Sequence, residues 1–281
     1  MSTPVVWIDG ALASADVARV SPFDHGLLVG DGVFETLRVY RGVPFAWRRH
    51  MERLAYSAAG LGLSVPDAGH LRAAADEVLA ANGLLEARLR VTVTGGPAPL
   101  GSERGDHGPT VIVAVNVARS WPSAERVVTV PWPRNERGAT AGLKTISYAE
   151  NVRALAHAHE HGATEALFLN TTGNVCEATG SNVFMVEDAR LRTPPAASGC
   201  LLGVTRALVL ELCDELDITV DTSPLAPSAL HGADEAFLTS STREVQPISH
   251  IDDTQLRGTP GAMTRRLAEA FAALVARDLD P

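Results

Sequence analysis

Lysine is almost absent from this 281-residue chain, because arginine accounts for all but one of its 24 Lys and Arg residues and the exception is Lys144. Arginine stays protonated in proteins, whereas a lysine amine that loses its proton attacks carbonyl carbons. A chain that carries nearly all of its positive charge on arginine therefore singles out Lys144 as a candidate for covalent chemistry with an aldehyde or a ketone. The alternative is a surface lysine retained by chance, and the neighbouring sequence decides between the two.

Cysteine, clustered basic charge and long apolar runs are also scarce. The three cysteines (Cys176, Cys200 and Cys213) lack the spacing of metal ligands, so we expect reduced thiols in a cytoplasmic protein. A net charge of −9 argues against nucleic acid or an anionic membrane as a partner. No apolar run approaches membrane-spanning length, and the N-terminus does not resemble a secretory signal. A small-molecule ligand is the remaining expectation.

The pattern of apolar residues predicts a mixture of strands and helices. Strands are expected at residues 5–8, 33–40, 88–94, 110–117, 126–130, 165–169, 182–186 and 235–239, and helices at 47–61, 68–81, 148–161, 203–216 and 263–277. Their irregular order predicts an α+β fold rather than a regular βαβ alternation. A short polar linker at 118–122 predicts a smaller N-terminal α+β domain of residues 1–120 and a larger C-terminal domain of residues 121–281.

Chemically distinctive residues surround the lysine in sequence. Lys144 lies between a loop-rich stretch and a predicted helix, where catalytic groups are commonly presented. Glu177 follows a turn and precedes a buried-looking strand. The segment 199–206 is a glycine-containing loop that runs into a helix, which is a typical anion site, and Arg53 and Ser241 offer further phosphate contacts. An amine, a carboxylate for a pyridinium nitrogen and a phosphate cradle are the requirements of pyridoxal 5′-phosphate.

Taken together and in this order, these segments resemble the fold-type IV enzymes, which are the class IV aminotransferase-like users of pyridoxal phosphate. That family includes branched-chain and D-amino-acid aminotransferases and 4-amino-4-deoxychorismate lyase. The matching segments are residues 24–26, 30–36, 50–54, 142–152, 177–184, 193–195, 203–206 and 239–247. The resemblance implies a two-domain fold like that of D-amino-acid aminotransferase, a cofactor at the domain interface and a homodimer that completes the site.

The resemblance also implies a role for individual residues. Lys144 is expected to form a Schiff base with the cofactor and to carry the substrate proton, and Glu177 to keep the ring nitrogen protonated. The phosphate is expected to be held by the Arg53 side chain, by backbone N–H groups of the segment Gly203, Val204 and Thr205, and by the hydroxyls of Thr205 and Ser241. Tyr148 is expected near the lysine, although its spacing differs by one residue from that of the branched-chain enzymes.

The reaction is predicted from the residue at position 36, from the short spacing between Lys144 and Tyr148, and from the similarity of the whole sequence to lyase members of the family. Thr36 stands where lyase members carry a proton-donating hydroxyl, whereas branched-chain aminotransferases tend to have glycine there. The hypothesis is therefore 4-amino-4-deoxychorismate lyase, which releases 4-aminobenzoate and pyruvate for folate synthesis, with a D- or branched-chain amino-acid aminotransferase as the alternative. Glu35 departs from the threonine that some lyases have. Arg104 is predicted to bind a substrate carboxylate, with Arg38 and Arg90 as further arginines of open role. The physiological amine and its stereochemistry stay open.

Three other interpretations are disfavoured. A pyridoxal-phosphate-binding protein without activity is disfavoured because both Lys144 and Glu177 are present. Glycines at 26, 30 and 32 do not have the spacing of a dinucleotide-binding loop, and a strand-like segment follows them. His157 and His161 are one helical turn apart, but the sequence shows no evident third ligand, so a solvated helix face is expected and no metal.

Overall fold

A computed structural model describes residues 3–281, which group into two compact units. The first unit takes the chain up to Arg119 together with residues 143–148 and 279–281, and the second takes residues 120–142 and 149–278. The lysine segment, which the sequence assigns to the C-terminal domain, thus groups with the first unit. The division into domains at residue 120 remains a prediction.

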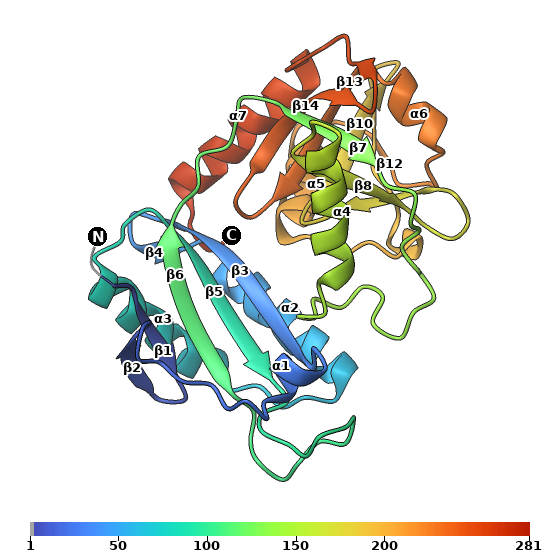
Figure 1. Cartoon of the computed structure of the whole chain (residues 1–281). Coiled ribbons are helices and arrows are strands. Elements are labelled where there is room, and N and C mark those ends of the chain that lie inside the picture. The colour runs from blue at the N-terminus through green and yellow to red at the C-terminus, as the bar shows by residue number, and fades with distance from the viewer. Residues whose placement is uncertain (1–2) are drawn as a thin grey trace. The chain divides into compact units, whose positions relative to one another are not determined.

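An antiparallel sheet forms the first unit, with six strands in the order β2-β1-β6-β5-β3-β4 (Figure 1). The strands are β1 (Val5–Ile8), β2 (Ala11–Ser14), β3 (Gly32–Tyr40), β4 (Val43–Pro44), β5 (Ala87–Thr94) and β6 (Val111–Val117). The helices are α1 (His25–Leu28), α2 (Trp47–Leu61) and α3 (Ala68–Asn82). The ends of α2 and α3 have local causes: Gly62 and Gly83 adopt left-handed backbone conformations, and the Asp67 carboxylate caps the start of α3.

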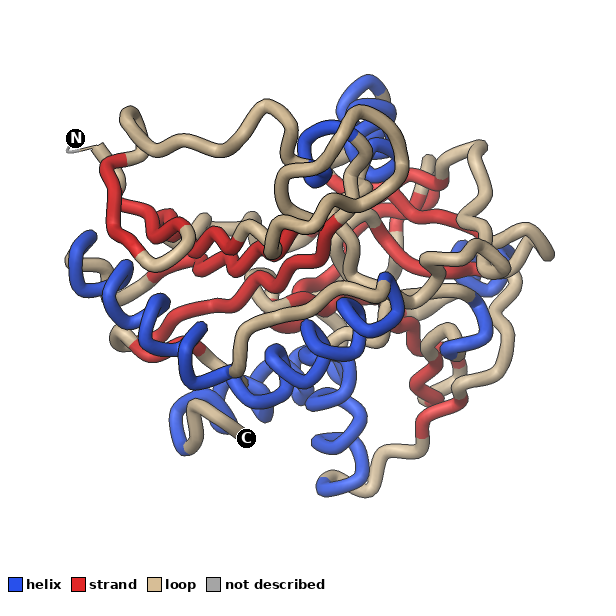
Figure 2. The backbone as a smooth tube through the Cα atoms, turned by 90° about the horizontal axis from the view of Figure 1, so that it is seen from below, coloured by secondary structure: helices blue, strands red, loops and turns tan. Residues whose placement is uncertain are grey.

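Helices α2 and α3 cover one face of this sheet (Figures 1 and 2). Alternate residues of β3 point toward them, because successive side chains of a strand face opposite sides. Val33, Leu37 and Val39 therefore join the apolar residues of both helices in one core, while Phe34 and Thr36 lie on the opposite face of the sheet. The core thus fixes which side chains of β3 are left for binding.

The second unit contains a mixed sheet of nine strands in the order β12-β11-β10-β13-β14-β7-β8-β9, with β15 beside β14. The strands are β7 (Glu125–Thr129), β8 (Glu165–Leu169), β9 (Val175–Ala178), β10 (Asn182–Glu187), β11 (Arg190–Arg192), β12 (Val220–Asp221), β13 (Glu235–Ser240), β14 (Glu244–Ile251) and β15 (Thr254–Gln255). The helices are α4 (Ala149–Glu160), the 3₁₀ turn η1 (Ala196–Ser198), α5 (Val204–Glu215), α6 (Pro227–Gly232) and α7 (Ala262–Arg277).

Two parallel crossovers lie inside this second sheet. Strands β7 and β8 pair in parallel, and α4 connects them, so β7–α4–β8 is a βαβ unit. Strands β11 and β12 also pair in parallel, with α5 between them, and β14 pairs in parallel with β7. The remaining pairings of the sheet are antiparallel. The predicted α+β class is confirmed, with the two βαβ units β7–α4–β8 and β11–α5–β12 embedded in it.

The three cysteines are buried and unpaired, as the sequence predicts. Burial raises the pKa of the Cys213 thiol to about 11, and the pKa of Cys200 is raised for the same reason. These thiols are therefore packing groups rather than nucleophiles. None of the helices in residues 3–281 combines the length and apolar character needed to span a bilayer. A cytoplasmic location remains a prediction.

Candidate active site

The backbone around Lys144 is tied to the first unit on both sides. Its carbonyl oxygen accepts a hydrogen bond of 3.1 Å from the Phe34 N–H, and its own N–H donates to the Ser57 hydroxyl at 3.1 Å. Two residues later the Ile146 N–H donates to the Gly32 carbonyl at 2.9 Å. The segment thus runs beside the start of β3 like a short additional strand, which holds the lysine in place without using its amine.

Gly32 makes this close approach possible. A Cβ atom at this position would lie 2.8 Å from the Ile146 side chain and 2.8 Å from the Val93 carbonyl oxygen, which is closer than real Cβ atoms come. Glycine therefore lets the lysine segment lie against β3. Gly32, one of the glycines that superficially suggest a dinucleotide loop, thus helps to position the candidate nucleophile.

The Phe34 ring is the centre of a cluster of polar and charged side chains in the first unit. The Lys144 Nζ lies 4.5 Å from the ring centroid, the Arg90 Cζ lies 3.7 Å from it, and the Tyr148 ring meets it edge-on at 5.1 Å. Thr36 lies two residues along the same face of β3 and pairs directly across from Arg90 on β5. An amine, a guanidinium, a phenol and a hydroxyl are thus gathered on one sheet face, and the two neighbouring cations favour an anionic ligand.

Arg53 is held from the opposite face of β3 by a buried carboxylate. Its Nε and Nη2 donate to the two oxygens of Glu35, each at 2.7 Å, and the His50 Nδ1 lies 2.7 Å from the same carboxylate. Burial raises the pKa of Glu35, but the electrostatic interactions and hydrogen bonds of Arg53 and His50 together outweigh this and hold that pKa far below its usual range. Burial lowers the pKa of His50, so His50 donates to Glu35 as a neutral ring. Glu35 thus fixes the orientation of Arg53.

Replacing Glu35 with Gln is expected to lower the free energy of unfolding by about 2 kcal/mol, because it removes the charge on which two buried donors converge. The folded pKa of Glu35 lies below the unfolded value of about 4.3, so its stabilisation is present above that pH and is lost as the pH falls toward the folded pKa. Urea unfolding between pH 7 and pH 3 measures both effects, and the variant should lose less stability than the wild type on acidification.

The matched control is Glu52→Gln on the exposed side of α2, where the carboxylate pairs with Arg48 and is 63% exposed. It should change stability by less than about 0.5 kcal/mol. Equal effects of the two substitutions would contradict a special role for Glu35.

Arg104 makes contacts that bind its loop to the first unit. Its guanidinium donates to both oxygens of Asp31, each at 2.7 Å, and to the carbonyls of Leu61 and Gly62 at the end of α2. These bonds occupy most of its donors, so its predicted substrate role stays a prediction and Arg90 becomes the better candidate for that role. Arg38 is likewise engaged, by a 2.6 Å hydrogen bond to the exposed Glu86.

Glu177 lies in β9 of the second unit, not at the end of a turn as the sequence suggests. One of its oxygens accepts the Leu201 N–H at 2.9 Å, and the other lies 3.6 Å from the Arg134 Nε. Arg134 also stacks over the Phe168 ring at 4.1 Å and donates to Asn151 at 2.9 Å. The carboxylate is thus held between a backbone N–H and a guanidinium. Arg134 was not predicted from the sequence, because its position beside Glu177 depends on strand pairing.

The predicted phosphate segment begins helix α5. Its N-cap, Gly203, offers no side chain to cap the helix, so the first N–H groups, including those of Val204 and Thr205, are oriented toward any anion placed there. A Cβ at Gly203 would lie 2.2 Å from the Asn182 Oδ1, and the Asn182 amide donates to the Leu201 carbonyl at 2.7 Å. The loop before α5 is therefore held against the start of β10.

Two buried hydroxyls lie beside this helix start. Ser181 directly precedes Asn182, and Thr239 pairs with Asn182 across strands β10 and β13. Within residues 3–281 neither the Ser181 Oγ nor the Thr239 Oγ1 has a hydrogen-bond partner, although both are buried. Ser241 follows Thr239 in the turn between β13 and β14. Buried polar groups are normally satisfied, so these hydroxyls indicate that a polar ligand belongs here. Ser181 and Thr239 were not among the site residues predicted from the sequence, whereas Ser241 was.

Comparison with known proteins agrees with this arrangement. The family model for amino-transferase class IV matches residues 32–251. A protein of Methanocaldococcus jannaschii, provisionally named a branched-chain-amino-acid aminotransferase, is 34% identical over 272 residues, which cover 95% of this chain and 94% of that protein. The chain belongs to the class IV aminotransferase family.

Other members of the family include more than one activity. The aminodeoxychorismate lyase of Bacillus subtilis is 30% identical, with 94% of this chain and 92% of that protein covered. The branched-chain aminotransferase of Thermoproteus uzoniensis, solved with norvaline, superposes with a TM-score of 0.90 at 31% identity, over 97% of this chain and 94% of that one. The resemblance to fold-type IV enzymes and the two-unit mixed fold predicted from the sequence are confirmed.

Class IV aminotransferases are enzymes that use pyridoxal phosphate, and solved structures similar to this chain hold N-(5′-phosphopyridoxyl)-L-glutamate or pyridoxamine 5′-phosphate. Each unit by itself offers groups of the kind that this cofactor requires: the first has the Lys144 amine, and the second has the Glu177 carboxylate and the start of α5 with two buried hydroxyls beside it. The roles of these residues remain predictions. The cofactor predicted from the sequence is therefore the cofactor of the family.

Proposed function

We propose that the protein is a 4-amino-4-deoxychorismate lyase, which converts its substrate into 4-aminobenzoate and pyruvate with pyridoxal phosphate as cofactor. The observation that carries this proposal is the Thr36 hydroxyl, which lies on the sheet face of Phe34, the ring that the Lys144 amine approaches to 4.5 Å. Lyase chemistry needs a second proton donor in addition to the lysine, because the departing three-carbon unit must be protonated to become pyruvate.

In this proposal Lys144 and Glu177 together make possible the removal of a proton from a substrate carbon. Lys144 would hold the aldehyde end of the cofactor through its amine, and that amine would remove the proton from the substrate carbon that bears the amino group. Glu177 would face the ring nitrogen of the cofactor, and Arg134 beside it would hold the Glu177 carboxylate in position. The bound cofactor supplies an electron sink for the negative charge that loss of the carbon-bound proton leaves behind. Tyr148, edge-on to Phe34, is proposed to orient the lysine.

The phosphate of the cofactor is proposed to be held by charge, dipole and hydroxyl groups. Arg53, held by Glu35, supplies the positive charge. The N–H groups of Val204 and Thr205 supply the helix N-terminus. The proposed hydroxyl donors are Thr205 and Ser241, as predicted from the sequence, together with Ser181 and Thr239.

The substrate is proposed to bind through its negative charge. 4-Amino-4-deoxychorismate carries two carboxylates, and Arg90 offers a guanidinium directly across from Thr36. Arg90 thus orients the substrate so that the Thr36 hydroxyl can deliver a proton to the methylene carbon of the departing enol. That proton, with cleavage of the ether C–O bond, completes pyruvate and leaves an aromatic ring.

The decisive test is to supply 4-amino-4-deoxychorismate to the cofactor-loaded enzyme without any keto acid. Equal, multiple-turnover release of 4-aminobenzoate and pyruvate is the expected result. Thr36→Val should slow this release by about 10²-fold, and Thr36→Ser should restore most of it, because a hydroxyl is the group required. Release by the valine variant at the wild-type rate would remove Thr36 from the mechanism.

An aminotransferase acting on D- or branched-chain amino acids is the second candidate, favoured by the 34% identity to the Methanocaldococcus jannaschii protein. An aminotransferase needs an acceptor keto acid and does not release 4-aminobenzoate. If the chorismate-derived substrate yields no product while an amino acid bleaches the yellow enzyme, transamination replaces the lyase proposal.

We also propose that the chain forms a homodimer. Several large apolar side chains near α1 and the adjoining loop are exposed in the first unit, among them Phe23 (52%), Leu27 (70%) and Leu100 (75%). Exposed apolar groups gathered in one region are typical of association surfaces. Sedimentation should give twice the chain mass of 29.6 kDa, and Leu27→Glu should shift the equilibrium toward the monomer.

A further inference from the structure

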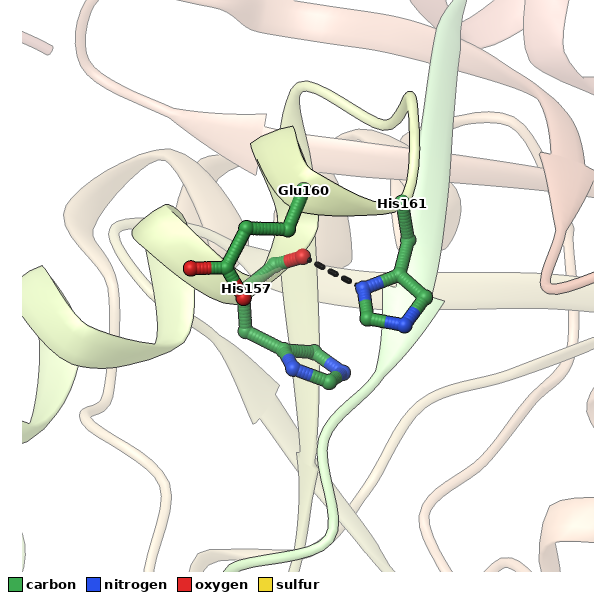
Figure 3. A group of neighbouring side chains, drawn as sticks. All are labelled: His157, Glu160 and His161. Carbon is green, nitrogen blue, oxygen red and sulfur yellow. Dashed lines mark hydrogen bonds between the residues drawn. The ribbon is translucent and has the colours of Figure 1, made fainter.

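The end of helix α4 gathers three side chains that the proposed reaction does not use. His157 and Glu160 lie in the last turn of α4, and His161 follows directly (Figure 3). One ligand atom from each of the three lies within 4.8 Å of the other two. Two histidines four residues apart lie on one helix face, which is the spacing by which helices bind zinc. No third ligand was evident from the sequence, and Glu160 supplies one.

The hydrogen bonding of His161 leaves one ring nitrogen suited to a metal. Its Nδ1 lies 2.8 Å from the His157 carbonyl oxygen, as the dashed line in Figure 3 marks. A carbonyl oxygen only accepts hydrogen bonds, so Nδ1 carries the proton and a lone pair is left on Nε2. Metal-binding histidines are generally fixed in this way, with one ring nitrogen donating to a carbonyl and the other coordinating.

The other two side chains are positioned by neighbours in the same unit. The Trp132 ring packs edge-on against the His157 ring, with centroids 5.5 Å apart. The Arg153 guanidinium lies 4.8 Å from the Trp132 ring centroid and 3.6 Å from the Glu160 carboxylate. These contacts keep the imidazole and the carboxylate at the same end of α4, where Glu160 and His161 are exposed and accessible to an ion from solution.

We propose that His157, Glu160 and His161 form a surface site for one divalent transition-metal ion of the class that imidazole prefers, such as Zn²⁺, Ni²⁺ or Cu²⁺. Ligand atoms on one zinc are about 3.3 Å apart, given zinc–nitrogen distances of about 2.0–2.1 Å in a tetrahedral site. The present separation of up to 4.8 Å is closed by side-chain rotation at an exposed helix end. Two nitrogen ligands and a single carboxylate do not suit Mg²⁺ or Ca²⁺, which require oxygen-rich sites.

The test is titration of the untagged, cofactor-loaded enzyme with Zn²⁺ by calorimetry and with Cu²⁺ by tryptophan fluorescence. One Zn²⁺ per chain is expected, and Cu²⁺ should quench Trp132, because that ring packs against His157. His157→Gln and His161→Gln should each weaken binding by at least about tenfold. Trp132→Phe should remove the metal-dependent quenching while calorimetric binding persists.

The matched control is His159→Gln, an exposed histidine of the same helix that is not part of the cluster. It should bind Zn²⁺ as tightly as the wild type. Glu160→Gln should weaken binding without changing the stoichiometry, which confirms the third ligand. The proposal fails if the wild type binds no Zn²⁺, if the His161 variant binds as tightly as the wild type, or if the Glu160 and His159 variants behave alike.

Discussion

The Lys144→Ala enzyme is expected to lose turnover by at least about 10⁴-fold while it still folds and binds pyridoxal phosphate without a covalent bond. The backbone of Lys144, not its side chain, makes the hydrogen bonds to Phe34 and Ser57, so truncation of the amine leaves the segment in place. Product release from 4-amino-4-deoxychorismate measures the loss. The absorption spectrum of the bound cofactor reports separately whether it still binds.

Lys144→Arg is the control that separates nucleophile from charge. Arginine keeps the positive charge near Phe34 but cannot act as a neutral amine. Both variants should therefore be equally inactive. If the arginine variant retained a tenth or more of the wild-type rate, charge alone would explain the position and the covalent role of Lys144 would have to be abandoned.

Arg243→Ala is expected to lower the free energy of unfolding by about 3–5 kcal/mol, the largest stability effect predicted for this chain. The Arg243 side chain is 5% exposed and donates to Glu125 at 2.6 Å and to Glu165 at 3.4 Å. Its guanidinium also stacks on the Trp121 ring at 3.6 Å. Truncation leaves two buried carboxylates without their cation, which costs more than the pair itself contributes. Urea unfolding followed by circular dichroism measures the change.

Arg126→Ala provides a comparison of equal charge change. Arg126 neighbours Glu125 on β7, but its side chain is exposed, so its loss should alter stability by no more than about 0.5 kcal/mol. If the two substitutions destabilised the protein equally, net charge rather than the buried network would be responsible.

Features with a local cause are the ones that the sequence predicts well. Helix α2 spans Trp47–Leu61, the expected residues, because its apolar spacing and the glycine after it act within the segment. Strand β14 was not predicted, because it contains Pro247 and several polar residues and is recognisable only through its pairing with β13 and β7. Glu177 was expected at the end of a turn but lies in strand β9, and this strand too is recognisable only through its pairing with β8.

The residues of the candidate site also fall into two groups: those recognisable from the local sequence and those that depend on long-range packing. Lys144, Glu177 and the start of α5 stand out in the sequence because each combines a distinctive residue with a recognisable local segment, although their roles remain predictions. The position of Arg90 across from Thr36 depends on strand register, and the contact of Arg134 with Glu177 depends on how distant segments pack. Strand register and the packing of distant segments could not be predicted from this single sequence.

The membership of residues 143–148 in the first unit has a consequence for how this protein can be divided or recombined. The chain passes from one unit to the other four times, after residues 119, 142, 148 and 278. A gene fragment that stops at residue 119 would encode β3 without the lysine segment that pairs with it, and the complementary fragment would carry the nucleophile without its support. Neither unit is therefore a portable module, and exchange between related enzymes requires the six-residue insert to travel with the N-terminal part.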